Sequence, residues 1–145
     1  MAHTSASLEV PATADRVWQL IGGFNSLPDW LPLIPGSELG EGGRVRHLKT
    51  ADGHVIIERL EAFDEKARSY SYSIIEAPFP ASDYLATISV REVAGSASSR
   101  VTWSGSFSPV GVSDEEVVQL FHGIYEKGLM ALKESLESGD KKSLR

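Results

Sequence analysis

The residues with the clearest chemical potential lie in the stretch GHVIIERLEAFD, from Gly53 to Asp64, where charged side chains interrupt an apolar run. Its valine, isoleucine and phenylalanine content favours a strand, whose side chains alternate between two faces. One face would carry Arg59 and Glu61, and the other would carry Glu58. Because an unpaired charge is costly in a packed core, the pattern predicts an inner face that lines a cavity holding water or a polar ligand.

Most signatures of catalytic chemistry are missing from the sequence. No zinc-site spacing is found among the histidines, which are His3, His47, His54 and His122. The glycine-rich stretch LGEGGRV matches neither a P-loop nor a dinucleotide fingerprint, GxSxG is absent, and there is no cysteine. The sequence therefore predicts no metal and no cofactor, and it offers no nucleophile for covalent catalysis. General acid–base chemistry by Glu58 or Tyr84 stays open.

Composition and charge indicate one domain and exclude several kinds of partner. The chain has 145 residues, of which 41% are hydrophobic, enough for a single core. A formal net charge of −6 disfavours affinity that depends on nucleic-acid phosphates or anionic lipids. The sequence shows neither a signal peptide nor the roughly 20 apolar residues that cross a bilayer. We therefore expect a cytoplasmic protein with no nucleic-acid partner and no stable membrane insertion, and we leave the oligomeric state open.

Hydrophobic periodicity predicts a sheet that holds these polar residues. A first strand, SASLEV, precedes a helix that Thr13 caps and that Gly22 and Gly23 end. Three prolines around Trp30 allow only a short helical turn. Six further strands in close succession imply an antiparallel meander: Ser37 to Gly40, Arg44 to Thr50, His54 to Phe63, Arg68 to Glu76, Asp83 to Val93 and Ser99 to Ser108.

A long amphipathic helix is predicted after the last strand. Ser113 and Glu116 form a capping box, and apolar residues at helical spacing continue to about Ser138. Its length requires that it lie along the sheet. Gly139 is expected to end the helix, so that one domain spans residues 1–138 and residues 139–145 form a tail.

In this order the elements resemble the START-related helix-grip superfamily (SRPBCC), with its polyketide cyclase/dehydrase and plant abscisic-acid-receptor branches. The resemblance covers nearly the whole chain and rests on VPATADRVWQLIGGFNSLPDWLP, GRVRHLKTADGHVIIERLEAFDEKARSYSYSII, DYLATISV, VTWSGSFSP and the helix that begins SDEEVVQLF. It implies an α+β fold, a curved antiparallel sheet of about seven strands around a long C-terminal helix, with two short helices after the first strand. It also implies an interior cavity, open at one end, that binds a hydrophobic small molecule.

The resemblance further indicates which residues would bind the ligand. Glu58 falls where related receptors place an acidic residue in the pocket, and the other inward positions are Arg46, Leu48, Tyr72, Tyr84, Trp103, Leu120, Ile124 and Gly128. The cavity is expected to hold roughly 300 Å³ or more and to open near Trp30, Phe79 and the loop APFPAS. The glycine–proline gate of the plant receptors is replaced by TADGHV, so receptor-type gating is not implied.

Each site residue also has a purely structural explanation. Glu58 could be a partly exposed charge beside a bulge, and Arg46 could belong to a salt bridge at the rim. The inward aromatic side chains could fill a solid core, and Gly128 could allow the helix to pack closely on a strand. If Glu58 serves a ligand instead, its replacement by leucine should leave stability nearly unchanged or improve it.

Three functions therefore remain open from the sequence. The first is a binding or carrier protein for a polyketide, lipid, sterol-like compound or quinone. The second is an aromatase/cyclase-type enzyme that acts on a polyketone by acid–base catalysis in the same cavity. The third is a chaperone-cofactor-like interaction module, which would need an exposed apolar patch. The fold itself cannot decide among them.

Overall fold

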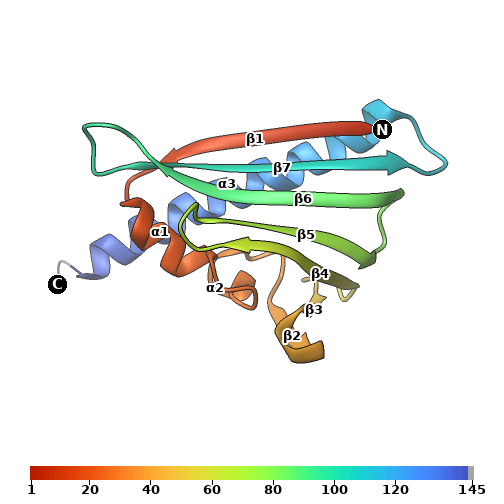
Figure 1. The fold of residues 1–145 in the computed structure, drawn as a ribbon, viewed down its shortest axis with the longest axis horizontal. Coiled ribbons are helices and arrows are strands. Elements are labelled where there is room, and N and C mark those ends of the chain that lie inside the picture. The colour runs from red at the N-terminus through yellow and green to blue at the C-terminus, as the bar shows by residue number, and fades with distance from the viewer. Residues whose placement is uncertain (144–145) are drawn as a thin grey trace.

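Seven strands form one antiparallel sheet that curves around the long helix α3 (Asp114–Ser143), which runs behind the sheet in Figure 1. The computed structural model describes the backbone of residues 1–143 and the side chains of residues 1–137. The strand order is β1-β7-β6-β5-β4-β3-β2, so the first strand pairs with the last one. The predicted helix-grip architecture is confirmed.

Strands β2 to β7 form the predicted meander, because each one pairs with the next along the chain. Their bounds agree with the predicted ranges to within two residues: β2 (Gly36–Gly40), β3 (Val45–Lys49), β4 (Val55–Asp64), β5 (Ser69–Glu76), β6 (Ala81–Glu92) and β7 (Ser99–Pro109). Strand β1 (Ala2–Val10) begins three residues before the predicted SASLEV, because β7 supplies antiparallel partners as far as Ala2 opposite Phe107.

Two short helices connect β1 to β2, as the sequence predicted. Helix α1 (Ala14–Ile21) begins at Thr13, whose hydroxyl accepts a hydrogen bond from the backbone N–H of Arg16 at 3.3 Å. Gly22 ends α1, and helix α2 (Leu27–Trp30) is a single turn with a proline at its start. Helix α1 contacts β6 and β7, while α2 contacts β2 and α3. The two helices therefore carry the chain from one edge strand of the sheet, β1, to the other, β2.

Helix α3 begins as predicted and continues further than predicted. The backbone N–H of Glu116 donates to the Ser113 hydroxyl at 3.2 Å, which caps the helix. The helix runs through Gly139 to Ser143, so the predicted end at Gly139 is wrong. A glycine in a helix costs about 1 kcal/mol but does not by itself end it. Residues 144 and 145 of the predicted tail lie outside the described residues.

The inner face of the sheet carries the residues that the alternation predicted. Tyr84 and Trp103 lie on one buried face of β6 and β7, together with their apolar neighbours at every second position. The buried side of α3 that faces them is formed by Val117, Phe121, Tyr125, Leu129, Leu132 and Leu136. This hydrophobic core therefore lies between the sheet and α3. None of the helices in the described part of the chain is long and apolar enough to cross a membrane.

Two glycines of α3 differ in their surroundings and give a matched test of helix packing. A Cβ atom on Gly128 would lie 2.7 Å from the Trp103 ring and 3.2 Å from Leu31, whereas one on Gly123 would meet nothing within 4 Å. We expect Gly128→Ala to lower the free energy of unfolding by about 1–2 kcal/mol, because overpacking outweighs the gain in helix propensity. Gly123→Ala should raise it by up to about 1 kcal/mol. Urea denaturation of both variants checks this, and shifts of the same sign would contradict it.

Candidate functional site

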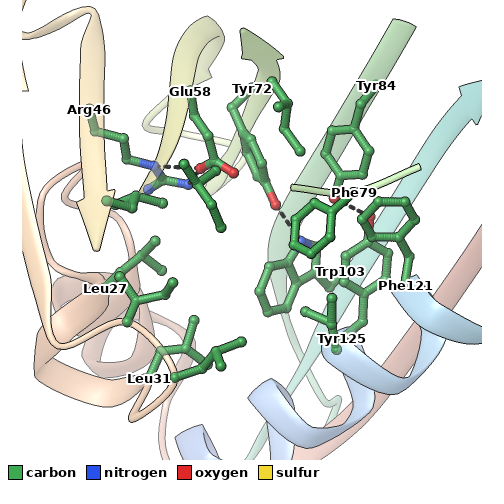
Figure 2. A pocket seen from close by; sticks show the side chains of 16 residues that line it. Leu27, Leu31, Arg46, Glu58, Tyr72, Phe79, Tyr84, Trp103, Phe121 and Tyr125 are labelled. Atoms are coloured by element: carbon green, nitrogen blue, oxygen red, sulfur yellow. Dashed lines mark hydrogen bonds and ion pairs between the residues drawn. The ribbon is translucent and has the colours of Figure 1, made fainter. Parts of the chain in front are cut away.

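A small cavity lies between the inner face of the sheet, the segment around α2 and helix α3 (Figure 2). Its volume is about 50 Å³. The predicted volume of roughly 300 Å³ or more is therefore wrong for this structure. The reason is that aromatic side chains from both layers fill the interior: the Tyr84 and Phe121 rings lie 4.8 Å apart, as do those of Trp103 and Tyr125. The remaining space suits one or a few water molecules.

The structure brings most of the predicted site residues together around this cavity. They come from five strands, the β5–β6 connection and α3: Arg46, Leu48, Glu58, Tyr72, Phe79, Tyr84, Trp103 and Ile124. The strand residues among them point to the same side of the sheet because side chains alternate between the two faces along each strand. Their roles in binding a ligand remain predictions.

Three predicted residues do not line the cavity. Trp30 is buried and packs edge-to-face on Trp103 at 6.0 Å, and its ring N–H has no hydrogen-bond partner among the described residues. Leu120 is 37% exposed, because the buried stripe of α3 is centred on Phe121 and Tyr125. Gly128 packs against Trp103, which supports the close-packing explanation for it. The last two line a groove on the outside of the molecule.

The cavity also contains residues that the sequence analysis missed. They are apolar or aromatic and come mainly from the α2 segment and α3: Leu27, Leu31, Leu33, Ile34, Ile56, Ile74, Phe121 and Tyr125. Phe121 and Tyr125 are spaced by four residues, so a pair of aromatic side chains on one helix face was a usable signal. The spacing of Leu27, Leu31 and Ile34 is also helical, but the prolines there concealed it.

A buried ion pair occupies one end of the cavity. Pairing of β3 with β4 places Arg46 directly opposite Glu58. Nε of Arg46 donates to Oε1 of Glu58 at 2.8 Å, and Nη2 lies 2.7 Å from the same oxygen. The two residues are 1% and 6% exposed, respectively. The pairing of β4 with β5 does shift register between Ile57 and Glu58, as at a bulge, but Glu58 is buried there. Glu58 is therefore not a partly exposed charge, and Arg46, which is also buried, does not form a salt bridge at the rim.

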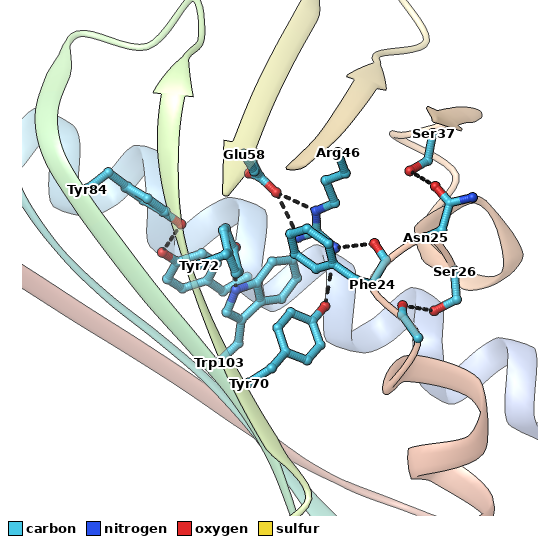
Figure 3. A network of polar contacts seen from close by, with 12 residues as sticks. Phe24, Asn25, Ser26, Ser37, Arg46, Glu58, Tyr70, Tyr72, Tyr84 and Trp103 are labelled. Atoms are coloured by element: carbon cyan, nitrogen blue, oxygen red, sulfur yellow. Dashed lines mark hydrogen bonds and ion pairs between the residues drawn. The ribbon is translucent and has the colours of Figure 1, made fainter. Parts of the chain in front are cut away.

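Other groups fix the guanidinium of Arg46 in place, as Figure 3 shows. Its Nη1 donates to the Phe24 carbonyl at 3.0 Å and to the Tyr70 hydroxyl at 3.4 Å. The Phe24 and Tyr72 ring centres lie 4.2 and 4.9 Å from its central carbon, close enough for cation–π attraction. Burial lowers the pKa of Arg46, but Tyr70, Glu58 and Tyr72 raise it, and the net shift is upward. The guanidinium is therefore charged.

The charge on Glu58 depends on two opposing effects. Burial raises the pKa of the carboxyl group, and the charge and hydrogen bonds of Arg46 lower it. The net shift is upward from the ordinary value. A permanently charged guanidinium with short contacts to Oε1 nevertheless favours the ionised carboxylate at neutral pH.

A second polar part of the cavity wall is formed by tyrosine hydroxyl groups. The ring N–H of Trp103 donates to the Tyr72 hydroxyl at 3.0 Å, and the Tyr84 and Tyr125 hydroxyls share a hydrogen bond. A Cβ atom on Gly105 would overlap the Tyr125 hydroxyl, so a glycine is needed there for this contact. Burial is the main cause that raises the pKa values of Tyr72 and Tyr84 well above 10. These groups are therefore protonated and can donate hydrogen bonds.

An apolar groove of about 500 Å³ lies on the outside of the cavity wall, between α3 and the segment after α2. The cavity and this outer groove have Leu31, Leu33 and Ile124 in common. These three side chains therefore separate the two spaces. In the part of the chain with described side chains, no group of three histidine, aspartate or glutamate residues could hold a metal ion.

Comparisons with known proteins agree with this architecture. Residues 1–137 match the sequence model of a family described as polyketide cyclase/dehydrase and lipid transport. A structure of an uncharacterised protein from Bacillus thuringiensis has 60% identity and a TM-score of 0.91, covering 92% of this chain and 98% of the other. A structure of protein XoxI from Bacillus cereus has 61% identity and a TM-score of 0.91, covering 93% of this chain and 95% of the other.

A more distant structure shows the fold alone. The Zhui aromatase/cyclase from Streptomyces sp. R1128 has 16% identity and a TM-score of 0.74, covering 99% of this chain and 95% of the other. No curated protein matches the chain.

Proposed function

The chain belongs to the polyketide cyclase/dehydrase and lipid transport family, and on that premise we propose that it binds a hydrophobic small molecule in the cavity between the sheet and α3. One observation carries the proposal: the wall of an otherwise apolar and aromatic cavity contains the buried pair of Arg46 and Glu58. Burying two charges costs several kcal/mol per ion before they attract each other. A role of this ion pair in binding the polar group of a ligand would explain why the fold retains it despite its cost to stability.

Binding would require the cavity to expand. At about 50 Å³ it is smaller than the roughly 300 Å³ that a drug-sized ligand occupies. The side chains of Leu31, Leu33 and Ile124 line both this cavity and the outer groove. Displacing them would join the two spaces and supply the missing volume. Leu33 is 44% exposed, so its side chain has room to turn outward.

A neutral fluorescent probe, N-phenyl-naphthylamine, tests the proposal. We expect a saturable rise in its fluorescence with one probe per chain. Ile124→Trp should abolish it, because a larger ring would fill the boundary between cavity and groove. Leu120→Trp is the matched control, since Leu120 lines the groove but not the cavity. Leu120→Trp should bind the probe with unchanged equilibrium affinity, even if the larger side chain slows the entry of the probe into the cavity. Equal loss in both variants would place the probe in the groove, and absence of binding to the original protein would contradict the proposal.

An aromatase/cyclase-type reaction is the second candidate function. The observation that favours it is the presence of a carboxylate, Glu58, and protonated hydroxyls of Tyr84 and Tyr125 around one cavity. A carboxylate can accept a proton and a tyrosine can stabilise a developing enolate by donating a hydrogen bond. Time-resolved analysis of a polyketone incubated with the protein tests it, because a carrier would return the compound unchanged.

The remaining expectations from the sequence stay predictions. These are the cytoplasmic location, the absence of a nucleic-acid partner and the choice among polyketide, lipid, sterol-like and quinone ligands. The interaction-module alternative would use the outer groove, where Leu33 and Leu120 are exposed, rather than the cavity.

A further inference from the structure

Arg46 has no free positive charge to offer a ligand. Its Nε and Nη2 contact Glu58, and its Nη1 donates to the Phe24 carbonyl and to Tyr70. The residue is 1% exposed, with aromatic rings close to the guanidinium. The Glu58 carboxylate therefore already neutralises this cation, so an anionic ligand group would gain no ion pair with Arg46.

Glu58, in contrast, keeps an unused acceptor. Both contacts from Arg46 go to Oε1, and no group in the described part of the chain donates a hydrogen bond to Oε2. Figure 2 shows Glu58 at the cavity wall, between Arg46 and Tyr72. An ionised carboxylate oxygen only accepts hydrogen bonds. Oε2 is not fully enclosed by protein atoms, so a molecule in the cavity can reach it. This end of the cavity therefore suits a hydrogen-bond donor.

The tyrosine hydroxyls offer a donor instead. The Tyr72 hydroxyl accepts from the Trp103 ring N–H, and the hydroxyls of Tyr72, Tyr84 and Tyr125 are joined by two hydrogen bonds, one between Tyr72 and Tyr84 and one between Tyr84 and Tyr125. These two bonds use two of the three hydroxyl protons, so one proton is left to donate. A carbonyl oxygen would accept it. Among the described residues that line the cavity, Arg46 and Glu58 are the only charged ones.

We infer that the ligand is a neutral alcohol or phenol whose hydroxyl donates to Oε2 of Glu58 and whose apolar body carries a carbonyl toward the tyrosines. The inference rests on the proposed function, since it names the ligand class of the same cavity. Carboxylic acids are excluded because their negative charge would approach Glu58 with no cation free to compensate it.

Three probes of nearly equal size test the donor requirement in the unmodified protein, by displacement of N-phenyl-naphthylamine at neutral pH. β-Naphthol carries the donor, its methyl ether lacks it, and β-naphthoate is an anion. We expect the ether to bind at least about tenfold more weakly than the naphthol, because a charge-assisted hydrogen bond is lost. The naphthoate should not displace the fluorescent probe. An acetyl-substituted β-naphthol should bind more tightly than β-naphthol itself.

The double variant Arg46→Met with Glu58→Leu is the control, because it removes the acceptor without leaving a single buried charge. Its affinities for the naphthol and the ether should become equal to within about twofold. Equal affinities in the unmodified protein, tighter binding of the naphthoate, or no gain from the acetyl group would overturn the inference while leaving the proposed function intact. Failure of every neutral probe, including N-phenyl-naphthylamine, would overturn both.

Discussion

Replacing Glu58 with leucine is expected to lower the free energy of unfolding by about 3–5 kcal/mol. The substitution leaves the Arg46 guanidinium 1% exposed and without its carboxylate. From the sequence alone, leucine in place of a ligand-binding Glu58 would be expected to leave stability nearly unchanged or to improve it. The buried ion pair leads to the opposite expectation, because the cost comes from the partner left behind rather than from Glu58 itself. Guanidinium denaturation of the variant measures the change.

A second substitution separates the unpaired charge from other causes. Adding Arg46→Met to Glu58→Leu should bring the stability back to within about 1 kcal/mol of the original, since apolar replacements of a buried pair are often neutral or stabilising. Arg59→Met is the matched control on the same strand: its contact with Glu41 at 3.6 Å is exposed, so a change of less than about 0.5 kcal/mol is expected. A double variant as unstable as Glu58→Leu would contradict this explanation.

Replacing Phe121 with alanine should cost about 3–5 kcal/mol and should also create room for a ligand. The ring is 1% exposed and packs against Phe79, Tyr84 and Phe107, with centroid distances of 4.7–5.2 Å. Because Phe121 lines the cavity, the lost volume would adjoin the existing space. We expect the variant to bind naphthalene at least about tenfold more tightly than the original protein.

Phe107→Ala provides the control for that experiment. Phe107 is fully buried in the same aromatic cluster but does not line the cavity, so it should be similarly destabilising without the gain in affinity. Thermal unfolding with and without naphthalene reports both effects, since a ligand that binds only the folded state raises its stability. An equal gain from both variants would show that any core vacancy binds naphthalene.

The fold could be predicted because its signals are local and agree with one another. Alternation along β6 and β7 identified the inner face, and turn residues between short apolar runs indicated a meander. The resemblance to the helix-grip superfamily, added to this alternation, predicted Glu58, Tyr72, Tyr84 and Trp103 as inward positions, and all four line the cavity. Once β3 and β4 pair, the register also sets Arg46 opposite Glu58.

The helix face and the cavity volume could not be predicted in the same way. Apolar residues of α3 cover more than one side, so periodicity alone did not distinguish Leu120 from Phe121 as the inward position. The volume depends on how Tyr84, Trp103 and Tyr125 pack against one another, which is a property of side-chain geometry rather than of sequence pattern. Leu31 lines the cavity because of the path that the proline-rich segment around it takes, and the sequence pattern did not predict that path.

The most direct test of ligand binding in the cavity is a nitrogen-15 NMR titration that follows the three tryptophan indole signals as N-phenyl-naphthylamine is added. Trp103 lines the cavity and donates its ring N–H to Tyr72 there, whereas Trp18 packs against Phe63 and Tyr70 and does not line the cavity. A ligand in the cavity should shift the Trp103 signal saturably and leave the Trp18 signal in place. Saturable probe binding with an unmoved Trp103 signal would contradict a ligand site in this cavity.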